Sequence, residues 1–335
     1  MAYRYVFGPV RSGRLGLSLG LDLTGDTVCT MDCVYCEVGR TTCLTTQRKP
    51  YVPAQDILDE LAHWKEQAHQ EPDYVTLGGK GEPTLNSDMG AVIQGIRRIF
   101  PHTPVAVLTN STLLHDPQVR RELALADAVL PSLDSLVPAE LRRVNRPHPE
   151  VDLSALAQGL LDFRKEFTGR LLLEVLLVAG YNDSDANLAL LRQFIAGLGA
   201  DRVDVVTMTR PGTLASASPV CDETLARWRA TLAPLATGRP GDTTTPRPGG
   251  ARQFSTDAAS APGQGHPPRP ADADSAAQER VTASIERRPQ TAAQLAQALD
   301  LPPEAVRRAL EALATQGRLR TTASGGDAYH ALRQG

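Results

Sequence analysis

The stretch Cys29-Thr-Met-Asp-Cys33-Val-Tyr35-Cys36 decides how the rest of the chain is interpreted, because it gathers three cysteines in one short segment. The chain of 335 residues has five cysteines, and a fourth follows closely at Cys43. An odd number of cysteines disfavours a disulfide framework. Clustered cysteines in a cytosolic protein, where thiols stay reduced, point instead to a metal site.

The cysteine pattern by itself leaves three interpretations open. Thiolates ligate iron–sulfur clusters, and three ligands on one loop would leave one iron of a four-iron cluster open to another ligand. Zinc also takes thiolates but requires four ligands, and Cys43 is placed to supply the fourth thiolate to either metal. In the third interpretation the cysteines are buried free thiols that bind no metal.

The sequence around these cysteines resembles the radical S-adenosylmethionine (radical SAM) superfamily, whose C-x-x-x-C-x-x-C motif carries an aromatic residue before its last cysteine. The segments that carry the resemblance are 7–16, 29–36, 39–41, 81–85 and 145–149. Their order within residues 5–215 is similar to that of the wyosine-synthase-like branch of iron–sulfur oxidoreductases. Some members of that branch also carry a C-terminal helical module.

The resemblance implies a 4Fe-4S cluster on Cys29, Cys33 and Cys36, with one open iron that chelates the amino and carboxylate groups of S-adenosylmethionine (SAM). It implies reductive cleavage of SAM to methionine and a 5′-deoxyadenosyl radical, which takes a hydrogen atom from the substrate. It also implies an external electron donor of the flavodoxin or ferredoxin type. Wyosine synthase holds a second cluster on upstream cysteines, whereas this chain has no cysteine before Cys29. The resemblance therefore carries over the cofactors and not the substrate.

The substrate stays unidentified at this point, with RNA and protein as the candidates. The alternative function is an iron–sulfur DNA-binding regulator that senses redox state or iron. The loop Gly81-Glu82-Pro-Thr-Leu85 discriminates between the two, because a sensor has no use for it.

Strand and helix signals alternate along residues 1–236. Apolar runs that predict strands lie at 15–23, 74–77, 105–109, 128–130, 171–178 and 202–207, and helical periodicity lies at 54–70, 89–99, 151–166 and 185–198. Repeated strand-helix-strand units predict an α/β fold with a parallel sheet and right-handed crossovers. Six units predict a partial (β/α)6 TIM-like barrel, with an open doubly wound sheet as the alternative. The cysteine motif favours the barrel, whose functional groups collect where its strands end.

The loops after the predicted strands supply the candidate cofactor ligands. Gly79 and Gly81 allow the backbone to approach a ligand closely, and Glu82 is suited to accept hydrogen bonds from a charged amine. Small polar side chains after the next strands suit ribose hydroxyls and carboxylates, although such residues also cap helices and turns. The predicted cofactor-binding set is Tyr35, beside the adenine, with Gly79, Gly81, Glu82, Asn110, Ser132 and Asp134.

The chain is predicted to divide into a radical SAM barrel, a linker and a small module. Residues 237–277 contain no Val, Ile, Leu or Met and are predicted to be a disordered linker. Residues 278–335 predict three helices and a hairpin, which is a winged-helix-like plan. Thr291 and Gln294 form a capping box. Arg307 and Arg308 are suited to contact phosphates, so nucleic acid is a candidate partner of this module.

Net charge and hydropathy exclude some of the remaining classes of protein. The net charge of −3 disfavours a protein that coats nucleic acid through bulk electrostatics. No apolar run approaches the ~18 residues that a membrane span needs. Residues 1–5 contain no apolar signal core. We therefore expect a cytoplasmic enzyme that does not contact the membrane.

Overall fold

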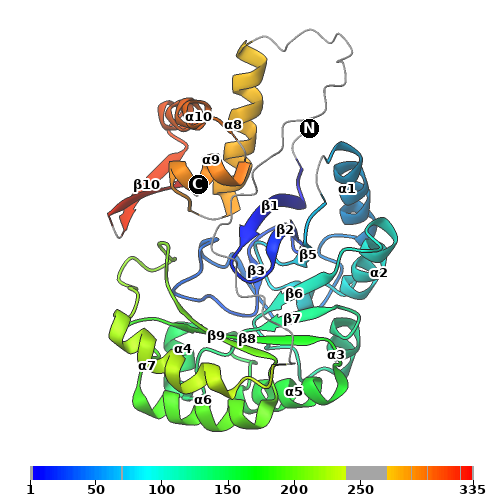
Figure 1. Cartoon of the computed structure of the whole chain (residues 1–335), viewed down its shortest axis with the longest axis vertical. Helices are drawn as coiled ribbons and strands as arrows, with labels where there is room; N and C mark the ends of the chain where they lie inside the picture. The colour runs from blue at the N-terminus through cyan, green and yellow to red at the C-terminus, as the bar shows by residue number, and fades with distance from the viewer. Residues whose placement is uncertain are drawn as a thin grey trace, which may run out of the picture.

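The computed structural model describes residues 3–68, 71–238, 270–287, 289–299, 301–324 and 326–333. Residues 3–238, here the sheet unit, form a seven-stranded sheet in the order β1-β2-β5-β6-β7-β8-β9 (Figure 1). The strands are β1 (Val6–Ser12), β2 (Gly16–Leu21), β5 (Tyr74–Leu77), β6 (Val105–Thr109), β7 (Ala128–Pro131), β8 (Arg170–Leu177) and β9 (Arg202–Thr207). β1 pairs antiparallel with β2, and all the other neighbours are parallel.

The α/β fold with a mostly parallel sheet is therefore confirmed, and the six expected strands form its parallel part. The sequence did not predict β1, where Gly8 and Pro9 interrupt the apolar pattern and the register shifts between Phe7 and Val10. β1 and β9 end the strand order and do not pair with each other in the described residues. The sheet is therefore open along these two strands.

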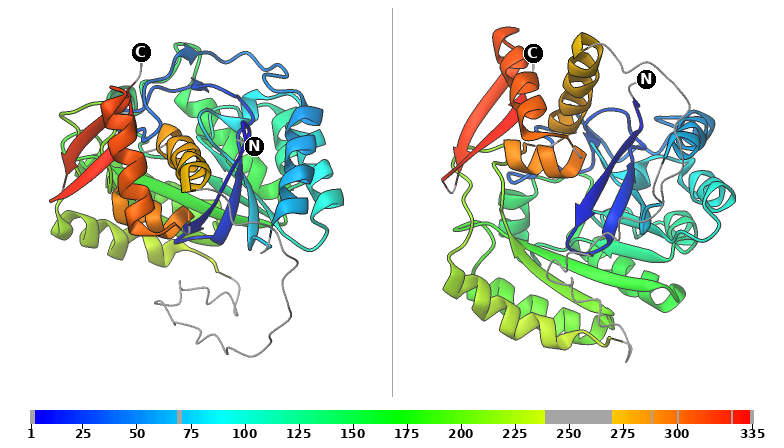
Figure 2. Two further views of the ribbon diagram at one scale, coloured as in Figure 1. Left: turned by 90° about the horizontal axis from the view of Figure 1, so that it is seen from above. Right: turned by 45° about the horizontal axis from the view of Figure 1, so that its top comes forward.

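Helices cover the outer face of the curved sheet, as Figure 2 shows. They are α1 (Ala54–Gln67), α2 (Met89–Ile99), α3 (Pro117–Leu123), α4 (Pro138–Val144), α5 (Leu153–Glu166), α6 (Asp185–Leu198) and α7 (Asp222–Leu232), with short 3-10 turns η1 (Pro83–Leu85) and η2 (Ala233–Leu235). Asp116, Asp152 and Ser184 cap α3, α5 and α6 by accepting bonds from first-turn amides. The main hydrophobic core lies between these helices and the sheet, and the carboxyl ends of the strands are left for polar loops.

A second group of elements, here the C-terminal unit (residues 270–333), has its own apolar core. Its elements are α8 (Pro270–Arg287), α9 (Ala292–Leu299), α10 (Pro303–Thr315), β10 (Leu319–Ser324) and β11 (Asp327–Leu332). The expected capping box is present. Gln294 N donates to Thr291 Oγ1 at 3.2 Å, and Thr291 N donates to Gln294 Oε1 at 3.1 Å. Three helices and a hairpin follow one another as expected.

The ends of the expected linker differ from the prediction, and its residues 239–269 lie outside the described residues. Thr237 N donates to Ala200 O at 2.8 Å, which ties that residue to the sheet unit. α8 begins at Pro270 and not at 278. The added turns are rich in alanine, the best helix former, and Ala277 is buried. A search for large aliphatic residues therefore missed this part of the helix.

The C-terminal unit packs on the open β1 edge of the sheet unit, where α8 and α9 contact β1 (Figures 1 and 2). Two polar contacts extend this docking to the carboxyl edge of the sheet. Lys80 Nζ, after β5, pairs with Glu286 Oε1 of α8 at 3.0 Å. Tyr329 OH of β11 donates to Thr209 O, after β9, at 3.0 Å. None of the helices in the described residues combines the length and apolar character that a membrane crossing requires.

Candidate active site

Cys29 is the last residue of β3 (Val28–Cys29), a short strand paired with β4 (Cys43–Leu44), and Cys33 and Cys36 lie on the loop that follows it. Burial raises the pKa of the Cys29 thiol to about 12 and also raises the pKa values of Cys33 and Cys36. Negative charge on Cys29 and Cys36 raises the pKa of Cys33 further, so the thiols lie close enough to influence one another. The three side chains are half-buried, and thiolates gathered in this way are stabilised by a cationic partner. An iron–sulfur cluster, which is held by thiolates, fits this donor set.

The three motif thiols do not form a site for one metal ion. In the described part of the chain, no group of three or more His, Cys, Asp or Glu side chains is arranged to hold one metal ion. Cys43 and Cys221 are exposed. The charges that raise the pKa values of Cys29 and Cys33 include other motif cysteines, whereas Cys43 is not among the main influences on any of the three.

Glu82 is a buried carboxylate that joins the ends of β5 and β6. Its Oε1 accepts hydrogen bonds from Thr84 N at 3.1 Å, Thr84 Oγ1 at 2.6 Å and Thr109 Oγ1 at 2.7 Å. Its Oε2 accepts one from Asn110 N at 2.8 Å. Burial raises the pKa of Glu82, while these hydrogen bonds oppose the rise. The Oε1 atom is thus occupied by three hydrogen bonds within the protein, whereas Oε2 accepts one and can accept another from a ligand.

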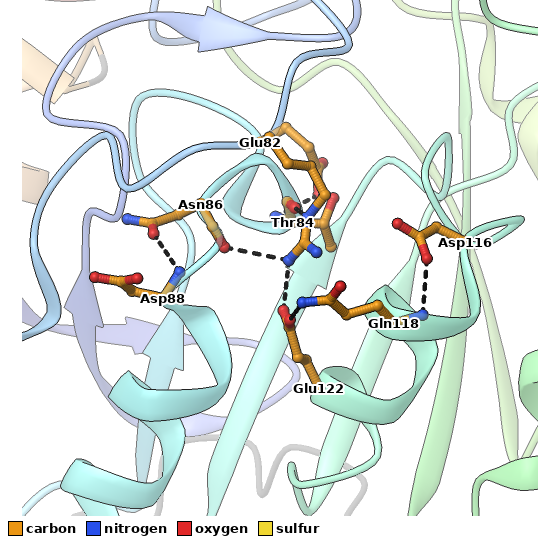
Figure 3. A network of polar contacts seen from close by, with 8 residues as sticks. Glu82, Thr84, Asn86, Asp88, Asp116, Gln118 and Glu122 are labelled. Atoms are coloured by element: carbon orange, nitrogen blue, oxygen red, sulfur yellow. Dashed lines mark hydrogen bonds and ion pairs between the residues drawn. The ribbon is translucent and has the colours of Figure 1, made fainter.

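The turn that follows Glu82 is anchored from the outer side of the sheet, as Figure 3 shows. Arg48 Nε donates to Thr84 O at 2.8 Å, and its guanidinium pairs with Glu122 of α3. Asn86 donates to Leu23 O at 2.7 Å, so the same turn is fixed to the loop that leads to the cysteines. The position of Glu82 therefore depends on several elements at once.

Two glycines let the Glu82 loop pack directly on residues 22–28, which lead into the cysteine loop. A Cβ at Gly81 would lie 2.0 Å from Val28 O, the residue before Cys29. Gly79 has a φ of +131°, and a Cβ there would lie 2.9 Å from Asp22 Cβ. The sequence predicted that these glycines allow close approach to a ligand. In the structure, the close approach is to the chain itself.

Replacing Gly81 by alanine is expected to destabilise the protein, because the obstructing atom is a backbone carbonyl. Overpacking of this kind costs about 1–3 kcal/mol. Each kcal/mol lowers Tm by roughly 2–4 °C in a domain of 150–250 residues. Gly78→Ala is the matched control, because its Cβ would meet only Leu108, at 3.8 Å. Thermal unfolding followed by circular dichroism should separate the two variants, and equal Tm values would contradict the argument.

Four of the predicted cofactor residues line one small cavity beside the cysteine loop. They are Tyr35, Asn110, Ser132 and Asp134, and the other lining residues are Met31, Leu133, Leu141, Asn145 and Leu156. The remaining predicted residues, Gly79, Gly81 and Glu82, lie on the neighbouring loop that contacts Val28 and Asn110. The fold therefore brings together residues that come from the ends of four strands.

Asp134 organises the wall of this cavity and is itself buried. Its Oδ2 accepts hydrogen bonds from Tyr35 OH and, at 2.7 Å, from Asn145 Nδ2, and its Oδ1 accepts one from Leu176 N at 2.9 Å. Burial raises the pKa of Asp134, whereas these bonds oppose the rise. Burial, followed by the charge of Asp134, raises the pKa of Tyr35 well above its usual range. The tyrosine is thus held as a neutral donor.

The sequence did not predict that the loop after β9 contacts the cysteine loop. Thr213 Oγ1 donates to Cys33 O at 2.8 Å, and Leu214 N donates to Val34 O at 3.1 Å. A Cβ at Gly212 would lie 2.6 Å from Val34 O. The Pro-Gly pair at 211–212 predicts a turn, but the sequence does not indicate that this turn contacts Val34.

Comparison with known proteins identifies the family. The family model described as the radical SAM superfamily matches residues 27–191. A UPF0026 protein of Synechocystis sp. is 39% identical over 210 residues, which cover 62% of this chain and 77% of that protein. A UPF0026 protein of Helicobacter pylori is 32% identical over 221 residues, which cover 66% of this chain and 71% of that protein. The chain belongs to the radical SAM superfamily.

The fold agrees with this assignment. A radical SAM methyltransferase from Sphaerobacter thermophilus superposes with a TM-score of 0.52 at 19% sequence identity, over 66% of this chain and 65% of that chain. The match thus spans just under two thirds of that chain and concerns the fold alone.

Radical SAM proteins are enzymes that use a 4Fe-4S cluster and SAM, and this chain is a radical SAM enzyme with those cofactors. Membership implies cleavage of SAM to a radical, with the electron supplied from outside the protein. The comparisons offer no support for the alternative of a DNA-binding sensor. The wyosine-synthase-like branch stays a prediction.

Proposed function

We propose that Cys29, Cys33 and Cys36 hold the 4Fe-4S cluster and that SAM binds beside them, at the small cavity. One observation carries this proposal. Three half-buried thiols, close enough to influence one another, lie next to a cavity lined by Tyr35 and other polar groups, at the carboxyl edge of a parallel sheet. We assign the sheet unit as a partial (β/α)6 barrel on the same grounds.

The protein's own groups would orient SAM. When bound, the reduced cluster supplies the electron that cleaves SAM to methionine and a 5′-deoxyadenosyl radical. Tyr35, fixed by Asp134, presents its ring to the adenine, and Ser132 lines the same cavity for the ribose. Glu82 Oε2 offers an acceptor to the methionyl amine, next to the Asn110 amide. Gly79 and Gly81 let this loop pack on the segment that leads into the cysteine loop.

The C-terminal unit, in this proposal, is a winged-helix-like module that presents the substrate at the carboxyl edge of the sheet. Its contacts through Lys80 and Thr209 support this role. Arg307 pairs with Glu304 and Glu311, and Arg308 pairs with Asp274 (2.9 Å). These ion pairs reduce the positive charge available to phosphates, so we favour a protein over a nucleic acid as the macromolecule presented. An electron donor of the flavodoxin or ferredoxin type and a cytoplasmic location remain predictions.

Anaerobically reconstituted protein is expected to release 5′-deoxyadenosine and methionine in equal amounts when it receives dithionite and SAM. The expectation follows from an open iron beside a cavity with groups suited to SAM. Liquid chromatography with mass detection measures both products. The control is the same protein without dithionite, which should release neither. A protein that binds the cluster and never cleaves SAM would favour the sensor.

A further inference from the structure

Asn145 is a buried side chain that lines the cavity beside the cysteines and has no role so far in the proposed SAM site. It follows α4, and its Nδ2 lies 3.4 Å from Cys33 Sγ, 2.7 Å from Asp134 Oδ2 and 3.2 Å from Tyr35 OH. The side chain therefore joins one motif cysteine to the wall of the neighbouring cavity.

The carboxamide can take only one orientation. Asp134 accepts from Tyr35, so the tyrosine oxygen is an acceptor toward Asn145, as are the carboxylate and the sulfur. All three neighbours are acceptors that share the two N–H groups of Nδ2, and a flipped carboxamide would present its oxygen to them. In the described structure, Asn145 Oδ1 is buried without a hydrogen-bond partner, so the donors alone orient this side chain.

The backbone on both sides of Cys33 is bound to the segment that carries Asn145. Asp32 N donates to Asn145 O at 3.0 Å, and Val34 N donates to Val144 O at 2.9 Å. A movement of Cys33 relative to the Asn145 amide would break these bonds. The N–H···S contact is therefore part of a rigid arrangement.

A second motif cysteine has the same kind of donor. Asn110 Nδ2 lies 3.4 Å from Cys29 Sγ and also donates to Thr30 Oγ1 at 2.7 Å. Two asparagines, one after β6 and one after α4, thus direct amide hydrogens at two cysteine sulfurs. Hydrogen bonds to the sulfurs are one of the features that set the reduction potential of a cluster, because they stabilise the more negative, reduced form.

We propose that Asn145 is a positioning residue that donates a hydrogen bond to the Cys33 thiolate and thereby raises the reduction potential of the cluster. This inference rests on the proposed function, since it requires Cys33 to be a ligand. It adds a tuning role to a residue outside the predicted cofactor-binding set.

The test is a redox titration of full-length, reconstituted protein without SAM, followed by electron paramagnetic resonance. Asn145→Leu substitutes an apolar side chain of similar size and removes the donors, and the midpoint potential of the cluster should shift to a more negative value. Asn187→Leu is the matched control. Asn187 is equally buried and donates to Asp134 O at 3.0 Å, but the hydrogen bonds of its carboxamide go to backbone groups and not to a cysteine. Its potential should match that of the wild type.

The outcomes separate this inference from the function on which it rests. A loaded Asn145→Leu protein with the wild-type potential overturns the tuning role and leaves the proposed function intact. Asn145→Ala is the second variant, because it avoids steric conflict. If neither Asn145 variant takes up iron while Asn187→Leu does, Asn145 serves assembly and tuning is again overturned. Wild-type protein that binds no cluster would instead overturn the proposed function.

Discussion

Replacing Cys33 by alanine is expected to abolish cluster binding and SAM cleavage, and Cys29→Ala and Cys36→Ala should have the same effect. Each variant removes one of only three thiolates. Loss of an outer-shell partner commonly lowers metal affinity by roughly 10–100-fold, and loss of a ligand itself should lower it further. Iron and sulfide content, the visible spectrum and 5′-deoxyadenosine release measure the result.

The matched controls are Cys43→Ala and Cys221→Ala. Both cysteines are exposed, and Cys43 lies on β4, where Val28 and not Cys29 is its pairing partner. These variants should keep the cluster, and its spectrum should still change when SAM binds. Loss of the cluster in Cys43→Ala would show a fourth thiolate ligand and would contradict the open iron. Retention of the cluster in all three motif variants would contradict the ligand set.

The periodic part of the fold could be read from the sequence because it depends on local patterns. Apolar runs located the six parallel strands, and the helix expected at 89–99 is observed as Met89–Ile99. β1 was missed because its pairing with β2 tolerates Gly8, Pro9 and a bulge. Edge strands need fewer apolar side chains than central ones, so their sequence signal is weak.

The candidate site was predictable only in part, for a different reason. The cysteine spacing and the polar residues after each strand are local signals. The contacts that organise them join distant residues, as when Asn145 meets Cys33 or when Arg14 pairs with Glu174 in the apolar strand β8. A buried carboxylate requires a partner, but sequence does not say which residue supplies it. The roles of Asn145 and Gly212 therefore emerged only from the fold.

A chain that ends at Gly238 is expected to retain the cluster and to cleave SAM within about twofold of the full-length rate, roughly 0.4 kcal/mol in the barrier. Among the described residues, the main core draws on none after Ala236, and the C-terminal unit has a core of its own. Ending the chain at Gly238 also preserves the bond from Thr237 N to Ala200 O. The cluster-binding loop and the cavity residues all precede this point. Iron content and 5′-deoxyadenosine release measure the result.

The same truncation should speed the loss of the cluster in air. Lys80 lies two residues before Glu82, and Thr209 precedes Arg210, which pairs with Glu37 beside Cys36. The C-terminal unit thus contacts loops that flank the cysteines on two sides, and its removal should admit solvent and oxygen. Bleaching of the visible spectrum under air measures this effect.

A full-length variant distinguishes the effect of weakened docking of the C-terminal unit from the effect of its removal. Glu286→Lys combined with Tyr329→Phe places a like charge opposite Lys80 and removes the donor to Thr209 O, while the unit stays attached. Bleaching should then be faster than in the wild type, because the docked position is weakened. Glu279→Lys, an exposed charge reversal on the same helix, is the control and should bleach at the wild-type rate. If the truncated chain takes up no cluster at all, the C-terminal unit completes the structure of the site, and its role as a separate presenting module is wrong.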